Sequence, residues 1–296
     1  MIGLESNSRK QKVLENARII YHQQIAGQIF RLRLDSPQIS GKAAAGQFVM
    51  LKIGNASDPL LRRPFSFSRI FPASGAFEIL YRVTGRGTWA LSRLQPGSPV
   101  SIVGPLGNGF QLNRDESAPL AFIAGGIGIA PLPELIFQTV SISKESRNMH
   151  LFYGARTASE LLPQQAVREL EIPVHFATDD GSLGFKGPVP RLFQEFYSQA
   201  AFRPAEIYSC GPLAMQYHVA GWALANDVLT QLSLESLMAC GIGACLGCAL
   251  PAADPENSQL ERFVHVCEDG PVFSAGSIKW NQISAQQTPP PTYLFS

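Results

Sequence analysis

The pattern of apolar and polar residues along the chain changes character near residue 113. Before that point, the segments 28–35, 77–83 and 98–104 alternate apolar with polar residues, and turns such as PASG and QPGS lie between them. A period of two predicts half-buried strands. Short strands, glycine and proline turns and little helical period together favour a closed antiparallel barrel over residues 13–113.

Beyond residue 113, apolar runs alternate with segments of helical period. We expect buried strands over 119–125, 149–156, 173–180 and 205–211, and helices over 131–144, over 159–170 and between the last two strands. This alternation predicts a doubly wound parallel sheet over residues 114–232. A small segment rich in glycine, cysteine and turns follows over 233–280, and the polar, proline-rich tail (281–296) is expected to be irregular.

One apolar stretch needs to be compared with a membrane span. Residues 118–137 carry a single charge, on Glu134, and twenty apolar residues are long enough to cross a bilayer. Three prolines and three glycines interrupt the stretch, so we interpret it as strand, loop and helix of a buried unit. No association with a membrane is therefore expected.

Composition restricts the class of protein. A chain of 296 residues, 45% apolar and 16% charged, suits two medium domains with an appendage. A net charge of +1 gives no indication of binding to nucleic acid or to an anionic membrane. The polar start of the chain argues against a secretory signal, so we expect a cytoplasmic protein. An odd number of cysteines, five, then favours a metal or redox role over disulfides.

Three of the five cysteines lie among glycines in residues 237–250 (LMACGIGACLGCAL). With Cys267 they are spaced C-x4-C-x2-C and then, after 18 residues, C, which is the plant-ferredoxin type of spacing for a [2Fe–2S] cluster. Zinc also accepts four thiolates, but zinc sites usually pair two short knuckles, and the second is missing. A Rieske site needs two histidines, and only His265 is near. Cys240, Cys245, Cys248 and Cys267 are therefore the predicted ligands, with zinc as the alternative.

The segment 60–68 (LLRRPFSFS) combines an arginine, an aromatic residue and a serine. Arg63 offers a fork to a pyrophosphate, Phe65 a ring to a flavin, and Ser66 a hydroxyl to flavin N5. On an extended segment, Arg63 and Phe65 point to one side and Ser66 to the other, unless Pro64 bends the chain. An edge strand with a salt bridge explains the same residues equally well.

A second candidate phosphate cradle follows the strand at 77–83. Gly85, Gly87 and Thr88 open a helix there, so backbone N–H groups and a hydroxyl lie at a helix N-terminus. The glycine-rich turn at 104–110 is expected to close the barrel.

The segment 124–131 (AGGIGIAP) follows a buried strand and precedes a helix that begins at Pro131, a preferred first helical position. Gly126-x-Gly128-x-x-Pro131 departs from the dinucleotide-binding G-x-G-x-x-G only in its last element. Gly125, Gly126 and Gly128 therefore allow a pyrophosphate to approach the backbone.

Cys210, in YSCGP (208–212), ends a later strand at the edge where open sheets bind ligands. Contact with a nicotinamide and a small buried residue are both open interpretations. Asp179 and Asp180 are interpreted as a solvated turn rather than a ribose contact. The histidines are scattered, and no side chain is predicted to act as a catalytic acid or base.

With these motifs in order, the chain resembles the ferredoxin–NADP reductase superfamily. The run MACGIGACLGC, followed by VCEDGPVF (266–273), is similar to the electron-transfer subunits of class 1B dihydroorotate dehydrogenases, and the resemblance covers residues 13–275. It implies a β plus α/β fold: an antiparallel flavin-binding barrel, a doubly wound nucleotide domain and a small iron–sulfur segment. It also implies bound FAD, one [2Fe–2S] cluster and NAD as the exchanged substrate.

The resemblance further implies site residues and a partner. Carried over by position, the FAD contacts are Arg63, Pro64, Phe65, Ser66, Leu80, Tyr81, Arg82, Gly87 and Thr88. The partner is a catalytic subunit carrying FMN, in a heterotetramer with two copies of each chain. Electrons from dihydroorotate then run from FMN through the cluster and FAD to NAD⁺ in pyrimidine biosynthesis. The choice of NAD over NADP rests on the resemblance alone.

Other functions share these motifs. The flavin subunits of hydrogenases, of sulfide dehydrogenases and of NADH-dependent ferredoxin–NADP oxidoreductases have the same architecture. An interaction module stapled by zinc, with no redox role, is the alternative from a different class.

Overall fold

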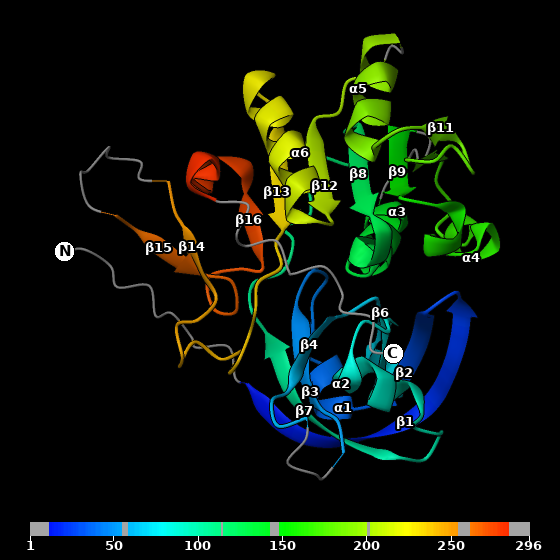
Figure 1. Cartoon of the computed structure of the whole chain (residues 1–296), viewed down its shortest axis with the longest axis vertical. Helices are drawn as coiled ribbons and strands as arrows, with labels where there is room; N and C mark the ends of the chain where they lie inside the picture. Colours follow the sequence, from blue (N-terminus) through cyan, green and yellow to red (C-terminus); the bar gives the residue numbers. More distant parts are fainter. Residues whose placement is uncertain are drawn as a thin grey trace.

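The computed structural model of the chain describes residues 12–54, 59–113, 115–142, 148–199, 202–253 and 261–283. The polar start of the chain and most of the tail expected to be irregular lie outside these residues. Figure 1 shows a rolled sheet below, a sheet with helices above it, and the C-terminal segment beside both.

The N-terminal sheet is antiparallel throughout. Its strands are β1 (Val13–Ala26), β2 (Ile29–Asp35), β3 (Phe48–Lys52), β4 (Arg63–Ser66), β5 (Arg69–Phe71), β6 (Ala76–Arg82) and β7 (Pro99–Leu106), in the order β4-β3-β7-β1-β2-β6-β5. The end strands β4 and β5 are consecutive parts of one segment. Phe67 N–H donates to Gln47 O (3.1 Å) and Ser68 N–H to Glu78 O (2.8 Å), so this segment passes from one edge of the sheet to the other. The sheet therefore rolls into the expected antiparallel barrel.

Alternating apolar residues of these strands fill the barrel. Leu32 and Leu34 of β2 and Phe77 and Ile79 of β6 are fully buried in one cluster. Short helices cover the barrel: α1 (Pro37–Ser40), the 3-10 turn η1 (Pro72–Ser74) and α2 (Arg86–Ser92). Burial of such side chains contributes about 1.5–3 kcal/mol each, which makes this core a main source of the barrel's stability.

The second sheet is the predicted parallel one. It is built from β8 (Leu120–Gly125), β9 (Met149–Ala155), β10 (Val174–Thr178), β11 (Phe185–Lys186), β12 (Glu206–Cys210), β13 (Leu229–Ser233) and β16 (Val272–Ser274), in the order β11-β10-β9-β8-β12-β13-β16. All neighbours are parallel except β13 and β16, which are antiparallel. The C-terminal segment thus supplies the last strand of this sheet.

Both faces of the parallel sheet are covered by helices. Ala121 and Ile123 of β8 pack in one cluster with residues of α5 (Val189–Gln199) and α6 (Leu213–Ala225). Leu120 and Phe122 pack in another cluster, with residues of α3 (Leu132–Ile142). Because successive strand residues face opposite sides, this division shows the doubly wound arrangement.

Two details differ from the sequence prediction. Residues 159–170 do not form one helix: the 3-10 turn η4 (Ala158–Glu160) and α4 (Gln164–Arg168) are separated at Pro163, which a helix tolerates in its first turn but not in its interior. Helix α3 begins at Leu132, one residue after Pro131, and follows a 3-10 turn η2 (Gly126–Ile129). Among the described residues, no helix is long and apolar enough to span a membrane.

The C-terminal segment packs against both sheets. It contains the hairpin β14 (Ala249–Pro251) and β15 (Phe263–His265), then β16, η5 (Ala275–Ser277) and η6 (Trp280–Gln282). Cys248, Val266 and Cys267 are buried in one cluster with Phe48 and Met50 of the barrel. The boundary at residue 233 stays a prediction, since β13 ends there and its sheet continues into β16.

Candidate functional site

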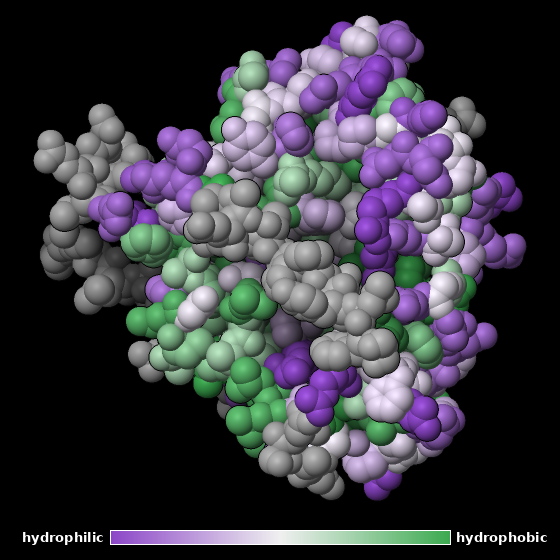
Figure 2. Space-filling view, in the orientation of Figure 1, coloured by the Kyte–Doolittle hydropathy of each residue, from purple (hydrophilic) through white to green (hydrophobic). Residues whose placement is uncertain are grey.

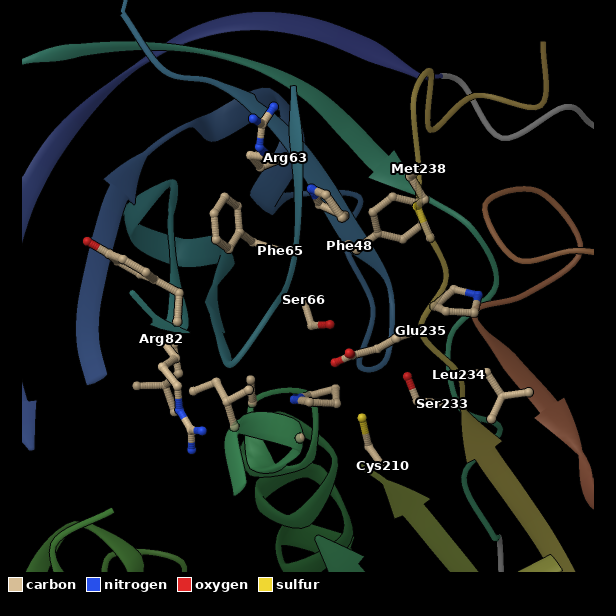
Figure 3. Close-up of a pocket in the computed structure, with 18 of the residues that line it drawn as sticks. Phe48, Arg63, Phe65, Ser66, Arg82, Cys210, Ser233, Leu234, Glu235 and Met238 are labelled. Carbon is tan, nitrogen blue, oxygen red and sulfur yellow. The ribbon is translucent and has the colours of Figure 1, made fainter. Parts of the chain in front are cut away.

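A cavity of about 350 Å³ lies between the barrel and the parallel sheet. Figure 3 shows Arg63, Phe65 and Ser66 on its barrel side, with Cys210 and Glu235 projecting from the other side. Eight of the nine residues expected to contact FAD line it: Arg63, Pro64, Phe65, Ser66, Leu80, Tyr81, Arg82 and Thr88. The ninth, Gly87, lies against Arg63, because a Cβ added there would be 3.0 Å from Arg63 Nε.

The segment 63–66 faces this cavity with all of its residues, so Ser66 is not turned away from it. Strand β4 pairs with β3 up to Ser66, and directly afterwards the chain pairs with β6. The chain therefore turns at this point, beside the cavity. Phe65 is held edge-on to Tyr81 at 5.7 Å between ring centroids. The Tyr81 hydroxyl in turn lies 2.8 Å from His22 Nε2, and burial raises the pKa of Tyr81. The strand thus presents a fixed aromatic surface to a flat ligand.

The candidate phosphate cradle at α2 is confirmed as a helix start, with Gly85 at the N-cap. The Thr88 hydroxyl accepts hydrogen bonds from the N–H groups of Thr84 (2.9 Å) and Gly85 (3.2 Å). These two donors are therefore satisfied within the protein. Arg63, beside Gly87, is left as the main cation that this corner of the cavity offers to a pyrophosphate.

A second cavity, of about 610 Å³, lies at the carboxyl ends of β8, β9, β10 and β12. Gly125, Gly126 and Gly128 line it as expected, whereas Pro131 and Cys210 line the first cavity instead. Gly126 adopts a φ of +54°, which favours glycine. At Gly128 an added Cβ would lie 2.5 Å from Gly211 Cα. The glycines therefore let the backbone itself form the wall of a dinucleotide-sized cavity.

The two cavities share part of their lining: Arg82, Ile127, Gly128, Leu234 and Glu235. Arg82, from the barrel, lies 3.8 Å from Glu160 of the other domain (Nη1 to Oε2). A ligand in one cavity therefore ends close to a ligand in the other. This is the arrangement that hydride transfer between two rings requires.

Glu235 is the residue that sequence reasoning missed. It follows β13 at the ligand-binding edge of the sheet and projects towards Ser66 in Figure 3. Its side chain is open to the solvent of the cavities, but the surrounding protein desolvates the carboxyl group and raises its pKa. Burial, and then the charge of Glu235, raises the pKa of the Cys210 thiol, so Cys210 stays a thiol at neutral pH. A carboxyl group two residues after a strand of the parallel sheet is the only local signal for it.

Two neighbouring carboxylates in the turn after β10, Asp179 and Asp180, have different surroundings. Asp180 accepts bonds from the N–H (2.9 Å) and hydroxyl (2.6 Å) of Ser182, which lower its pKa, as a solvated turn predicts. Asp179 instead lines the second cavity, together with Arg156 and His218. Asp179 is therefore within the cavity that a nucleotide would occupy, whereas Asp180 is part of the turn.

The four predicted cluster ligands come together as two pairs. Cys248 and Cys267 are buried, with 3.2 Å between their sulfurs. Cys245 N–H donates to Cys240 Sγ at 3.3 Å, which joins the other two residues. Cys245 is exposed, so one end of the site reaches the surface.

Backbone N–H groups surround these sulfurs. Ile242 N–H donates to Cys240 Sγ (3.4 Å), and Gly243 N–H donates to Cys267 Sγ (3.3 Å). Burial alone raises the pKa of Cys240, but the N–H groups outweigh it and lower that pKa to about 6. Gly241 and Gly243 adopt φ values of +70° and +81°, which glycine tolerates and which turn the N–H groups inward.

This donor set fits a two-iron cluster. In [2Fe–2S] sites four thiolates are divided between two irons, and the structure supplies two pairs of cysteines. The geometry therefore favours iron–sulfur over zinc.

Three family models match the chain in the same order as its parts. An oxidoreductase FAD-binding domain matches residues 16–110, and an oxidoreductase NAD-binding domain matches residues 122–220. The iron–sulfur cluster binding domain of dihydroorotate dehydrogenase B matches residues 235–279. The chain thus carries domains for FAD, for NAD and for an iron–sulfur cluster, as the sequence predicted.

Curated relatives and solved structures agree with this assignment. The electron transfer subunits of dihydroorotate dehydrogenase B (NAD(+)) from Desulforamulus reducens and Listeria monocytogenes are 37% and 38% identical to the chain. The matches cover 90% and 88% of this chain and 98% and 97% of those proteins. The structure of an NADH-dependent reduced ferredoxin–NADP oxidoreductase is 25% identical, covers 91% of both chains and has a TM-score of 0.77. The fold is therefore that of the ferredoxin reductases, and the chain belongs to the family of dihydroorotate dehydrogenase B electron transfer subunits.

Proposed function

We propose that the chain carries electrons from the FMN of a dihydroorotate-oxidising partner, through [2Fe–2S] and FAD, to NAD⁺. The main support is that one protein places three sites in sequence. The cavity lined by the FAD-binding residues shares Gly128 and Glu235 with the nucleotide cavity. At its other side, the same cavity is lined by Met238 and Pro271, next to the cysteine loop.

In this proposal, the residues expected from the sequence hold the groups. FAD is held by Arg63, Pro64, Phe65, Ser66, Leu80, Tyr81, Arg82, Gly87 and Thr88. NAD is held by Gly125, Gly126 and Gly128 in the second cavity, and its nicotinamide end reaches Pro131 and Cys210, which line the first. The cluster is held by Cys240, Cys245, Cys248 and Cys267.

The cofactors would supply the electron-transfer chemistry, and the side chains of the protein would position them. A bound flavin would supply the chemistry that joins the two sites, exchange of electrons in pairs with NAD and singly with the cluster. The chain fixes the geometry: Phe65 orients a ring, Ser66 offers its hydroxyl, and Arg63 neutralises phosphate charge. Orotate chemistry takes place on the partner, so the described site needs no acid or base for it.

The relatives are named as electron transfer subunits, which implies that a catalytic subunit is their partner. We propose that this partner carries FMN and binds at the cysteine loop, in an assembly of two copies of each chain. Cys245 is exposed there, and Leu237, Ile242 and Leu246 are 83%, 42% and 59% exposed. Figure 2 shows apolar side chains over this region and the neighbouring flank of the barrel. The cytoplasmic location stays a prediction.

The Cys245→Ser variant tests the relay. We expect NADH to reduce bound FAD at the wild-type rate in stopped-flow experiments, while electron delivery to the partner is lost. Ala244→Ser, also exposed and on the same loop, is the matched control and should retain both activities. Loss of both activities in Cys245→Ser, or retention of both, contradicts a separable relay.

The similarity to the ferredoxin–NADP oxidoreductase keeps a second function open. The two functions differ in the protein that copurifies with this chain. An FMN-containing subunit that oxidises dihydroorotate supports the proposal, whereas a partner with a second flavin and further iron–sulfur clusters supports the alternative.

A further inference from the structure

Lys12, directly before β1, joins the two parts of the cysteine site. Its Nζ donates to Ile242 O at 3.1 Å and to Glu268 Oε2 at 2.7 Å. The acceptors are 230 and 256 residues away in the chain. Lys12 therefore ties the start of the barrel to two separate segments of the C-terminal region.

Both acceptors adjoin cluster ligands from different pairs. The N–H group of Ile242 donates to Cys240 Sγ, and Glu268 follows Cys267. Gly243, between them, donates to Cys267 Sγ, and a Cβ added there would lie 2.8 Å from Glu268 Oε2. One cation thus closes the ligand loop onto the turn that carries the fourth ligand.

The ion pair is a poor source of folding stability. The side chains of Lys12 and Glu268 are 35% and 51% exposed, and exposed ion pairs contribute little to the free energy of unfolding. The reduction potential of a cluster is more sensitive to such a pair than the folding stability is. It depends on nearby charge, on hydrogen bonds to sulfur and on solvent exposure. The consequence of this contact is therefore expected at the cluster.

We propose that Lys12 is a positioning residue for the cluster. It holds the 240–245 loop against the turn at Glu268, and its positive charge raises the cluster's reduction potential. Glu268 has the opposite electrostatic effect. The inference rests on the cluster in this chain and is independent of the partner, so it can fail while the proposed function stands.

The test is an anaerobic redox titration of the purified flavoprotein, followed by the EPR signal of the reduced cluster. At low ionic strength, Lys12→Met should shift the potential to a more negative value and Glu268→Gln to a more positive one. Lys12→Arg and the double variant should stay near the wild-type value. High salt should shrink both shifts, since it screens exposed charges.

Lys186→Met is the control, because it removes the same charge from β11, at the edge of the sheet opposite to β16. Shifts of Lys12→Met and Glu268→Gln in the same direction, or a Lys12→Met shift no larger than that of Lys186→Met, overturn the electrostatic part. Iron release to a chelator tests positioning: Lys12→Met should release iron faster than Lys12→Arg, and equal rates overturn it.

Discussion

Gly128 lies where the two cavities meet. A methyl group added there should push the loop after β12 away and so move the two binding sites apart. A Cβ at this position would lie 2.5 Å from Gly211 Cα, 2.6 Å from Cys210 O and 2.7 Å from Gly211 N. These are backbone atoms, which cannot rotate aside. Ordinary contact begins at 3.4 Å, so the loop after β12 must retreat by 3.4 − 2.5 = 0.9 Å.

This displacement sets the expected effects of Gly128→Ala. Overpacking costs about 1–3 kcal/mol of unfolding free energy. A misplacement of about 1 Å between reacting groups lowers a rate on the order of 10²-fold. We therefore expect a lower melting temperature and slower reduction of bound FAD by NADH, measured by stopped-flow absorbance.

Gly221→Ala is the matched control. Gly221 lies in α6, and a Cβ there would meet nothing within 4 Å. Alanine is the better helix former by about 0.8–1 kcal/mol, so this variant should be at least as stable as the wild type and equally fast. A Gly128→Ala protein that melts and is reduced like the wild type would show that close packing of Gly128 against the loop after β12 does not set the geometry of the site.

Three further predictions concern buried and cavity-facing charges. Desolvation by the surrounding protein raises the pKa of Glu235, so its ionisation weakens the folded state as pH rises through that raised pKa; the melting temperature of Glu235→Gln relative to wild type should increase with pH, and a constant difference contradicts this. Asp179→Ala should raise kcat/KM for NADPH relative to NADH, because a carboxylate that lines the nucleotide cavity repels the additional phosphate charge of NADPH; an unchanged ratio excludes this effect. His150 lies 2.9 Å from His175, and burial lowers the pKa of His150 to about 4. The folded state therefore favours the neutral form of His150, and the resulting stability is fully present above pH 6.5. As pH falls towards 4, the free energy of unfolding should decrease by about 1–2 kcal/mol, after allowance for the half-exposed position of His150. His150→Phe should flatten this part of the pH–stability curve in thermal melts.

The elements and motifs that depend on local sequence could be predicted. The alternation in β2 and β6, the apolar run of β8 and the glycines at 125–128 all report local geometry. The cysteine spacing predicts the ligand set, because a cluster imposes that spacing directly.

What could not be predicted depends on contacts distant in the chain. Glu235 becomes part of the site only because β13 ends opposite Ser66, and Lys12 only because the barrel's first strand begins beside the cysteine loop. The helix expected over 159–170 was wrong because Pro163 interrupts it, a local signal that the helical period concealed. His150 and His175 are paired across neighbouring strands rather than scattered.

The central claim is that four cysteines of this chain hold a pair of irons next to a flavin. Chemical analysis of anaerobically purified protein for iron, acid-labile sulfide, zinc and FAD tests it most directly. We expect two iron and two sulfide ions for each FAD, as the composition of a [2Fe–2S] cluster requires. Protein that contains zinc in place of iron, or flavin with no labile sulfide, contradicts it.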